Sequence, residues 1–180
     1  MHRMSSTARA CAATFIMVTL VGVLGASTAF AVESTGLGFH ARDIRGGTAG
    51  AVRLTGGGAF DASTGVANTG GGFRCTESVG QGPLAGCQAG EGTHWHAETV
   101  LASTPFKCTS SAAESLKTAT TGADTVVLRA EFFRAGDGNQ ASFTANVFVS
   151  TRDLAPDVAG VQNVWIQGVG CDFATTNLSA

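Results

Sequence analysis

Short runs of alternating apolar and polar residues, separated by glycine-rich turns, fill most of the chain after residue 31. Alternation with a period of two residues is typical of strands with one buried face. Helical periodicity is scarce, and the chain contains 25 glycines but only three prolines, so glycine dominates the turns. We predict an all-β fold, namely a single antiparallel β-sandwich or barrel of about eight or nine strands with at most one short helix.

Two stretches carry the clearest hairpin signals. Residues 51–75 hold two glycine triplets on either side of the turn sequence "DASTG", and residues 124–150 alternate on both sides of "GDGN". We predict a hairpin in each, with the glycine triplets permitting a bend or a bulge. The remaining predicted elements are a short edge strand at 103–108, a serine-capped helix at 110–119 and a strand at 162–173.

The first thirty-one residues have the features of a signal peptide. Arg3 and Arg9 precede an apolar stretch at 12–25, and the small residues Ala29 and Ala31 form a cleavage pattern. We predict cleavage after Ala31, which divides the chain into a signal peptide (1–31) and a secreted β-domain (32–180). An uncleaved anchor is the alternative, but no stop-transfer pattern follows. No second long apolar segment occurs, so we expect no integral membrane segment in the mature chain.

Four cysteines follow the predicted cleavage site: Cys75, Cys87, Cys108 and Cys171. An even number of cysteines in an exported domain predicts two disulfides, for which three pairings are open. We favour 75–87, which closes a short glycine-containing loop, and 108–171, which ties a middle strand to the C-terminal strand. A structural zinc site is the alternative, but the chain has no close Cys-x-x-Cys pair.

The charge of the chain argues against one class of partner. Cleavage would remove Arg3 and Arg9, leaving nine basic against 13 acidic side chains. Binding to nucleic acid draws much of its free energy from basic side chains that neutralise phosphates, and no basic block is present. We therefore predict no nucleic-acid partner.

The stretch "THWHAETVL" (93–101) is the strongest candidate for chemistry. Read as a strand, it points Trp95 and Leu101 toward the core and His94, His96 and Glu98 to the other face. Residues two apart on a strand lie about 6.7 Å apart, so both histidines can reach one metal ion. Glu98 would lie about 10 Å along the strand from that ion, beyond the reach of its side chain.

A third metal ligand would have to come from a neighbouring strand. His40 is the remaining histidine after the cleavage site, and a carboxylate such as Asp43 is equally open. The stretch is similar to the first metal motif of the cupins, a family of small β-barrels, in Gly90, His94 and His96. It departs from that motif because no histidine follows His96 and the glutamate comes too early.

Other catalytic arrangements are not assembled in the sequence. There is no Gly-x-Ser-x-Gly elbow, and the carboxylates are spread singly. The motifs "TGGGAFD", "GGGFRC", "GPLAGCQAGEG", "PFKCT", "DTVVLRAEFFRAGDG" and "QNVWIQGVGC" together resemble a group of exported β-rich proteins of actinomycete-type bacteria that have no assigned function. This resemblance covers most of 51–171 and implies a secreted β-domain, without catalytic residues to transfer.

These observations favour a secreted, disulfide-stabilised β-domain without enzymatic activity, which binds a ligand or forms part of the cell envelope. We expect no cofactor for such a domain. One alternative is a metal-dependent small β-barrel enzyme, in which His94, His96 and His40 would hold a divalent ion. The other alternative is a carrier of a small apolar ligand inside a barrel, which requires an apolar interior cavity.

Overall fold

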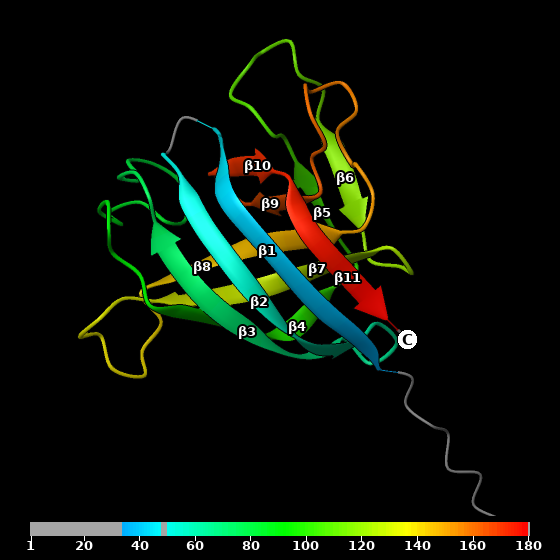
Figure 1. Ribbon diagram of the computed structural model, residues 1–180, viewed down its shortest axis with the longest axis horizontal. Helices are drawn as coiled ribbons and strands as arrows, with labels where there is room; N and C mark the ends of the chain where they lie inside the picture. Colours follow the sequence, from blue (N-terminus) through cyan, green and yellow to red (C-terminus); the bar gives the residue numbers. More distant parts are fainter. Residues whose placement is uncertain (1–33, 48–49, 180) are drawn as a thin grey trace, which may run out of the picture. The chain divides into compact units, whose positions relative to one another are not determined.

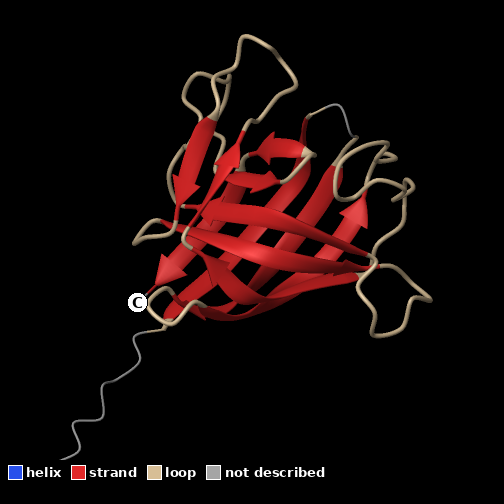
Figure 2. Ribbon diagram, turned by 180° about the vertical axis from the view of Figure 1, so that it is seen from behind, coloured by secondary structure: helices blue, strands red, loops and turns tan. Residues whose placement is uncertain are grey.

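The computed structural model describes residues 34–47 and 50–179, so the predicted signal peptide and its cleavage site lie outside the described residues. Within these ranges the regular structure consists of strands, without a helix (Figure 2). The strands are β1 (Thr35–Gly46), β2 (Val52–Asp61), β3 (Val66–Cys75), β4 (His94–Leu101), β5 (Ser103–Phe106), β6 (Lys117–Thr120), β7 (Thr125–Phe133), β8 (Phe143–Ser150), β9 (Val164–Ile166), β10 (Gly170–Asp172) and β11 (Ala174–Ser179).

Eight strands close into an antiparallel barrel. The order is β1-β2-β3-β4-β7-β8-β9-β10, and β10 pairs back with β1 through Arg45↔Cys171 and Gly46↔Gly170. β11 lies outside this ring and pairs with the first half of β1. In Figure 1, β1, β2 and β11 run diagonally across β7 and β8, as the tilt of strands in a small barrel requires. The predicted fold class is thereby confirmed, in its barrel form.

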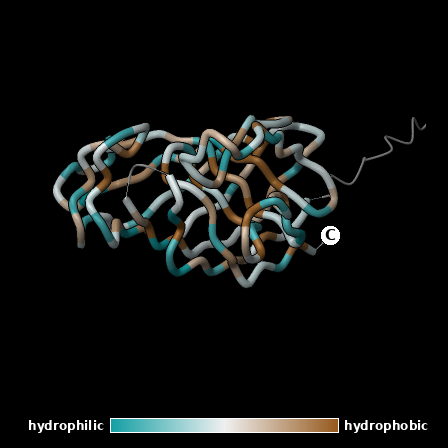
Figure 3. Tube along the Cα trace, turned by 90° about the horizontal axis from the view of Figure 1, so that it is seen from above, coloured by the Kyte–Doolittle hydropathy of each residue, from teal (hydrophilic) through white to brown (hydrophobic). Residues whose placement is uncertain are grey.

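Alternate residues of the strands fill the barrel interior. Apolar and hydrophilic stretches follow one another along the chain (Figure 3), and the inward set forms one cluster of buried side chains. The two predicted hairpins supply much of it, with β7 paired to β8 in the expected register. Its largest fully buried members are Trp95, Phe132, Ile44, Leu54, Leu84, Leu128 and Ile166. Because these side chains occupy the interior, the barrel gives no support to the carrier alternative.

The glycine triplets make room for Trp95. The indole is 1% exposed, and its Nε1 donates a hydrogen bond to the carbonyl oxygen of Thr55 at 3.0 Å. A Cβ atom on Gly56 would lie 2.5 Å from the indole Cζ2 and 2.8 Å from the carbonyl oxygen of Gly70. Position 56 therefore excludes any side chain while Trp95 holds its place.

A second, smaller core lies on the outside of the barrel. The β5–β6 hairpin forms its own two-stranded sheet, and side chains from it pack with outward-facing residues of β7, β8 and β9. The indole of Trp165 stacks on the ring of Phe148 with centroids 5.7 Å apart, and its Nε1 donates to the carbonyl of Lys107. Since this cover lies over β7–β9, the outer faces of β1–β4 stay open.

Both predicted disulfides are present. Cys75 is bonded to Cys87, and Cys108 is bonded to Cys171. The first closes the loop that follows β3. The second belongs to the outer core and fastens the chain after β5 to strand β10, next to the pairing that closes the barrel.

Two of the predicted elements are wrong. The helix expected at 110–119 is a series of turns that leads into β6, because Glu114 turns inward to bind backbone N–H groups instead of supporting a helical first turn. The single strand expected at 162–173 is the β9–β10 hairpin. Its turn lies at 167–169, where Gly168 takes a φ of 82°, a conformation that suits glycine.

Candidate functional site

Strand β4 carries the histidines on its outer face, and Trp95 between them points inward, as predicted. The His94 ring stacks on the ring of Phe133 with centroids 4.6 Å apart and an interplanar angle of 2°. The His96 ring lies 5.0 Å from the same phenyl ring, and its Nε2 is 3.0 Å from Oε2 of Glu131. Phe133 is 3% exposed although it faces outward. The two imidazoles therefore shield an apolar side chain from water.

A bulge in β4 changes which residues face the core beyond His96. The pairing with β7 shifts between His96 and Thr99, so that two residues of β4 stand opposite one residue of β7. This places Val100 in the barrel core and Leu101 against the outer core. The prediction that Leu101 points into the main core is therefore wrong, because strict alternation does not survive an inserted residue.

The structure does not bring His40 to the other two histidines. His40 pairs with Thr55, and Gly72 pairs with His94, so β2 and β3 lie between the two histidine-bearing strands. Three strand-to-strand steps amount to roughly 14 Å. Among the described residues, no group of three or more His, Cys, Asp or Glu side chains has the geometry to hold a metal ion. His94 and His96 share one face without a third ligand, and the metal-enzyme alternative gains no support.

The hydroxyl beside His94 is not set up as a nucleophile. Oγ1 of Thr93 lies 2.9 Å from the carbonyl oxygen of Phe133 and 3.1 Å from Nδ1 of His94. A threonine hydroxyl has one proton, and the carbonyl can only accept it. The contact with His94 is then a donation from Nδ1, in the tautomer that this network selects. Histidine consequently orients Thr93 and does not remove its proton.

Three arginines form a row across the outer face. Arg53 and Arg74 are directly paired on β2 and β3, and Arg42 lies in the bulge of β1 opposite Arg53. All three are exposed. Four of the nine basic side chains in the part of the chain that the structure describes form ion pairs, and these are Arg45, Arg134, Arg152 and Lys117. The row accounts for three of the other five, and we name it the arginine row.

A hollow of about 290 Å³ lies between Arg53 and Arg74. It is lined by Arg53, Thr55, Gly72, Phe73, Arg74, Gly92 and Thr93. Gly92 has a φ of 108°, and a Cβ atom there would lie 2.7 Å from the carbonyl oxygen of Phe73. This close approach excludes a side chain at Gly92, and Gly72 likewise adds no side chain to the lining of the hollow. Two guanidinium groups and the Thr55 hydroxyl give it donors for an anion, and the hydroxyl oxygens can also accept from hydroxyl groups of the ligand.

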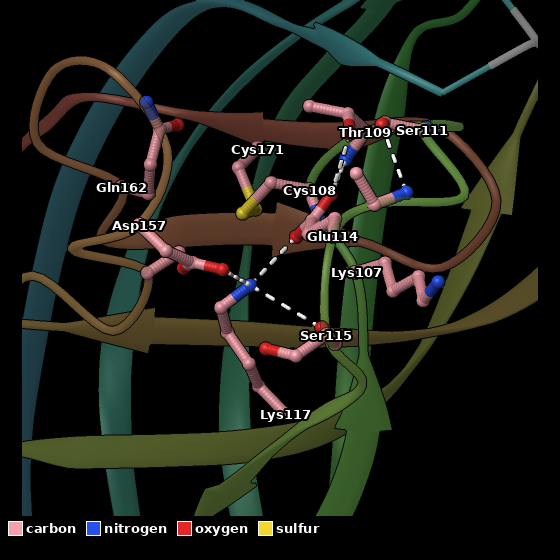
Figure 4. A network of polar contacts seen from close by, with 12 residues as sticks. Lys107, Cys108, Thr109, Ser111, Glu114, Ser115, Lys117, Asp157, Gln162 and Cys171 are labelled. Carbon is pink, nitrogen blue, oxygen red and sulfur yellow. Dashed lines mark hydrogen bonds and ion pairs between the residues drawn. A yellow bond between two sulfur atoms is a disulfide. The ribbon is translucent and has the colours of Figure 1, made fainter.

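A buried carboxylate lies on the covered side of the barrel (Figure 4). Glu114 accepts hydrogen bonds from the backbone N–H groups of Cys108 and Thr109, at 2.7 and 2.6 Å, and from the Thr109 hydroxyl. Nζ of Lys117 lies 2.8 Å from Glu114 and 2.9 Å from Oδ2 of Asp157. The network joins the turns before β6 to the loop that contains Asp157, beside the disulfide of Cys108.

Glu114 and Lys117 are both charged and form an ion pair within this network. Burial alone raises the pKa of Glu114, but hydrogen bonds from Lys117, Thr109 and the backbone of Cys108 outweigh it and lower the pKa to about 2. For Lys117, burial lowers the pKa, and the hydrogen bonds to Glu114 and Asp157 outweigh that effect and raise it. Both groups stay charged near neutral pH, so neither serves as a general acid or base. Their role is to hold the outer cover in place.

Comparisons with known proteins identify no family or relative of this chain. No family model, no curated protein and no solved structure matches the chain. In the described ranges, no helix has the length and apolar character needed to cross a membrane. The fold and the site define the class: a disulfide-braced, closed β-barrel with a filled interior and an open, arginine-bearing outer face. Sequence reasoning missed the arginine row, although Arg42, Arg53 and Arg74 were all visible, because the register of three strands brings them together.

Proposed function

We propose that this protein is a secreted, non-enzymatic binding domain that holds its ligand on the outer face of β1–β4. The observation that carries the proposal is the hollow between Arg53 and Arg74. It combines two exposed guanidinium groups, which form no ion pair with the residues that the structure describes, with the hydroxyl of Thr55 on the barrel wall. The filled interior supports an external site, because the barrel core is packed with side chains.

The disulfides support an exported location. Disulfides persist in oxidising surroundings outside the cytosol, and this domain has two of them, Cys75–Cys87 and Cys108–Cys171. We propose secretion or association with the cell envelope after cleavage following Ala31. Sequencing the N-terminus of the exported protein tests this step, and a start at Val32 is the expected result. An exported protein that retains residues 1–31 would contradict it.

The location of the binding face can be tested with two bulky substitutions. Gly72 lines the hollow from the outer face of β3, and the nearest neighbour of a Cβ atom there would be Oγ1 of Thr55, at 3.0 Å. Gly72→Trp should fill the hollow without disturbing the core, because the side chain of Thr55 lies on the outer face and can turn aside. Thr118→Trp adds the same side chain at an exposed position on β6, outside the barrel, and serves as the control.

Binding is measured by sedimenting each purified, disulfide-bonded protein with washed, insoluble cell-envelope material. We expect the wild type and Thr118→Trp to sediment with the material and Gly72→Trp to stay in solution, with equal melting temperatures for the three. Equal sedimentation of the two tryptophan variants, or none by the wild type, would refute a binding face on β1–β4. Release of soluble fragments from the envelope material would refute the non-enzymatic part.

A further inference from the structure

The arginine row carries an unbalanced charge that the fold alone does not explain. Like charges directly opposite each other on neighbouring strands destabilise a sheet, and Arg53 stands opposite Arg74. Within the described residues, neither forms an ion pair, while other arginines of the barrel do. An anionic ligand that lies across the row would remove this repulsion. The row is therefore better explained as a binding surface than as a stabilising feature.

The spacing of the three arginines indicates which kind of anion fits the row. Neighbouring strands are about 4.8 Å apart, so a chain that crosses β1, β2 and β3 at right angles meets one guanidinium group per strand. A guanidinium group matches a carboxylate through two parallel N–H···O bonds, a geometry that a point charge does not provide. A polymer with regularly repeated carboxylates fits this arrangement.

The groups beside the row fit a sugar backbone. Thr55 and Thr93 line the hollow with hydroxyls. At the other end of the row, a second hollow of about 590 Å³ is lined by His40, Arg42, Asp43, Asp172, Phe173 and Thr175. Phe173 is 57% exposed there, so its ring is open to contact with a ligand. A flat apolar ring beside cationic and hydroxyl groups suits the apolar face of a sugar that also carries a carboxylate.

Two carboxylates lie at the Arg42 end, and both are engaged. Asp43 pairs with Arg45, and Asp172 accepts a hydrogen bond from the backbone N–H of Asp43 at 2.9 Å. They weaken the attraction for an anion at this end of the row. The strongest anion position is consequently the hollow between Arg53 and Arg74.

We propose that the arginine row binds an acidic polysaccharide that carries a carboxylate on each sugar, with the chain lying across β1–β3. This inference rests on the proposed binding function and names its ligand class. Nucleic acid fits less well, because three guanidinium groups neutralise few phosphates and acidic side chains outnumber basic ones in the chain.

The test measures binding of oligogalacturonate by isothermal titration calorimetry, with neutral dextran as the reference sugar. Arg53→Gln/Arg74→Gln should weaken binding by roughly tenfold or more, since two charge-assisted contacts are lost. Arg129→Gln is the matched control: Arg129 is exposed, forms no ion pair among the described residues and lies on β7. It should change the affinity less than about twofold. Arg53→Lys/Arg74→Lys keeps the charge and should give an intermediate loss, because lysine lacks the planar fork.

Each alternative result has a definite meaning. Equal losses for the Gln pair and for Arg129→Gln, or equal binding of dextran, would overturn the proposal. Binding of oligothymidylate as tight as that of oligogalacturonate would assign the row to nucleic acid instead. If oligogalacturonate does not bind while Gly72→Trp still abolishes sedimentation with envelope material, the ligand class is wrong and the proposed binding face stands.

Discussion

The contact between Gly56 and Trp95 gives the sharpest test of how this barrel is packed. Replacing Gly56 with alanine adds one methyl group that would lie 2.5 Å from the indole Cζ2, where carbon atoms normally stay about 3.5–4.0 Å apart. The indole is buried and hydrogen-bonded to Thr55, so it has little freedom to move by the required ångström. Overpacking of this kind destabilises by about 1–3 kcal/mol.

Gly38→Ala isolates that effect, because a Cβ atom on Gly38 would meet nothing within 4 Å. Gly38 and Gly56 lie in paired strands, and both have ordinary extended backbone, so alanine reduces the entropy of the unfolded chain equally at either position. This entropy effect stabilises by about 0.4–1 kcal/mol when nothing clashes. We expect Gly38→Ala to be slightly stabilising, and Gly56→Ala to be less stable than Gly38→Ala by roughly 1–3 kcal/mol.

The measurement is guanidinium unfolding followed by far-ultraviolet circular dichroism under non-reducing conditions. Trp95→Phe removes the ring atoms that meet the new methyl group, so the double variant with Gly56→Ala should be more stable than the two single changes predict by about 1–2 kcal/mol. Equal stability of Gly56→Ala and Gly38→Ala would refute the packing argument. Strict additivity in the double variant would show that the indole is not the obstacle.

Three further changes test other parts of the structure. Replacing Cys108 and Cys171 with alanine should lower the free energy of unfolding by about 4 kcal/mol, and replacing Cys75 and Cys87 by about 3 kcal/mol, because the bonded cysteines are 63 and 12 residues apart in sequence. Chemical denaturation of the two variants checks this order, and the reverse order would contradict the chain-entropy account. Because the pKa of Glu114 is lowered from 4.5 to about 2, its stabilising charge is fully present above pH 4.5 and lost as pH falls toward 2. Between pH 6 and pH 2, the denaturation midpoint should therefore fall less in Glu114→Gln than in the wild type. Some pH dependence should remain in the variant, because hydrogen bonds from Ser63 and Thr64 also lower the pKa of Asp61 to about 2. Equal pH dependence of the two proteins would be evidence against this role of Glu114. His94→Ala should lose about 0.5–1.5 kcal/mol of stacking on Phe133, whereas His94→Phe should retain it; thermal unfolding compares them, and equal losses would rule out stacking as the cause.

The sequence predicts well where local chemistry decides the structure. The turn at 62–65 forms because Asp61 accepts hydrogen bonds from Ser63 and Thr64, and these partners are neighbours in the chain. Trp95 points inward because a large apolar side chain between polar neighbours has one favourable side. The disulfides follow from the even number and the spacing of the cysteines after residue 31.

The sequence predicts poorly where distant strands decide the structure. The bulge that moves Leu101 out of the main core depends on how β4 meets β7, and no residue in the strand itself signals it. In the sequence, the position of Glu114 is typical of the first turn of a helix. In the structure, its carboxylate instead accepts a hydrogen bond from the backbone N–H of Cys108. The arginine row needs the registers of β1–β3 at once, and the bulge that places Arg42 opposite Arg53 is again invisible in one strand.

Strand β1 pairs with β2 on one side and with two strands on the other, β11 along its first half and β10 at its end. The ring closes through the two residue pairs between β1 and β10, so losing them would leave two open edges at once. A strand of the ring can detach only by breaking its pairings on both sides. β11 is under no such constraint, because it pairs with β1 alone, and it can peel away while the ring stays shut. Amide hydrogens of β11 should then exchange with solvent by local fraying, whereas those of the ring wait for the whole barrel to open.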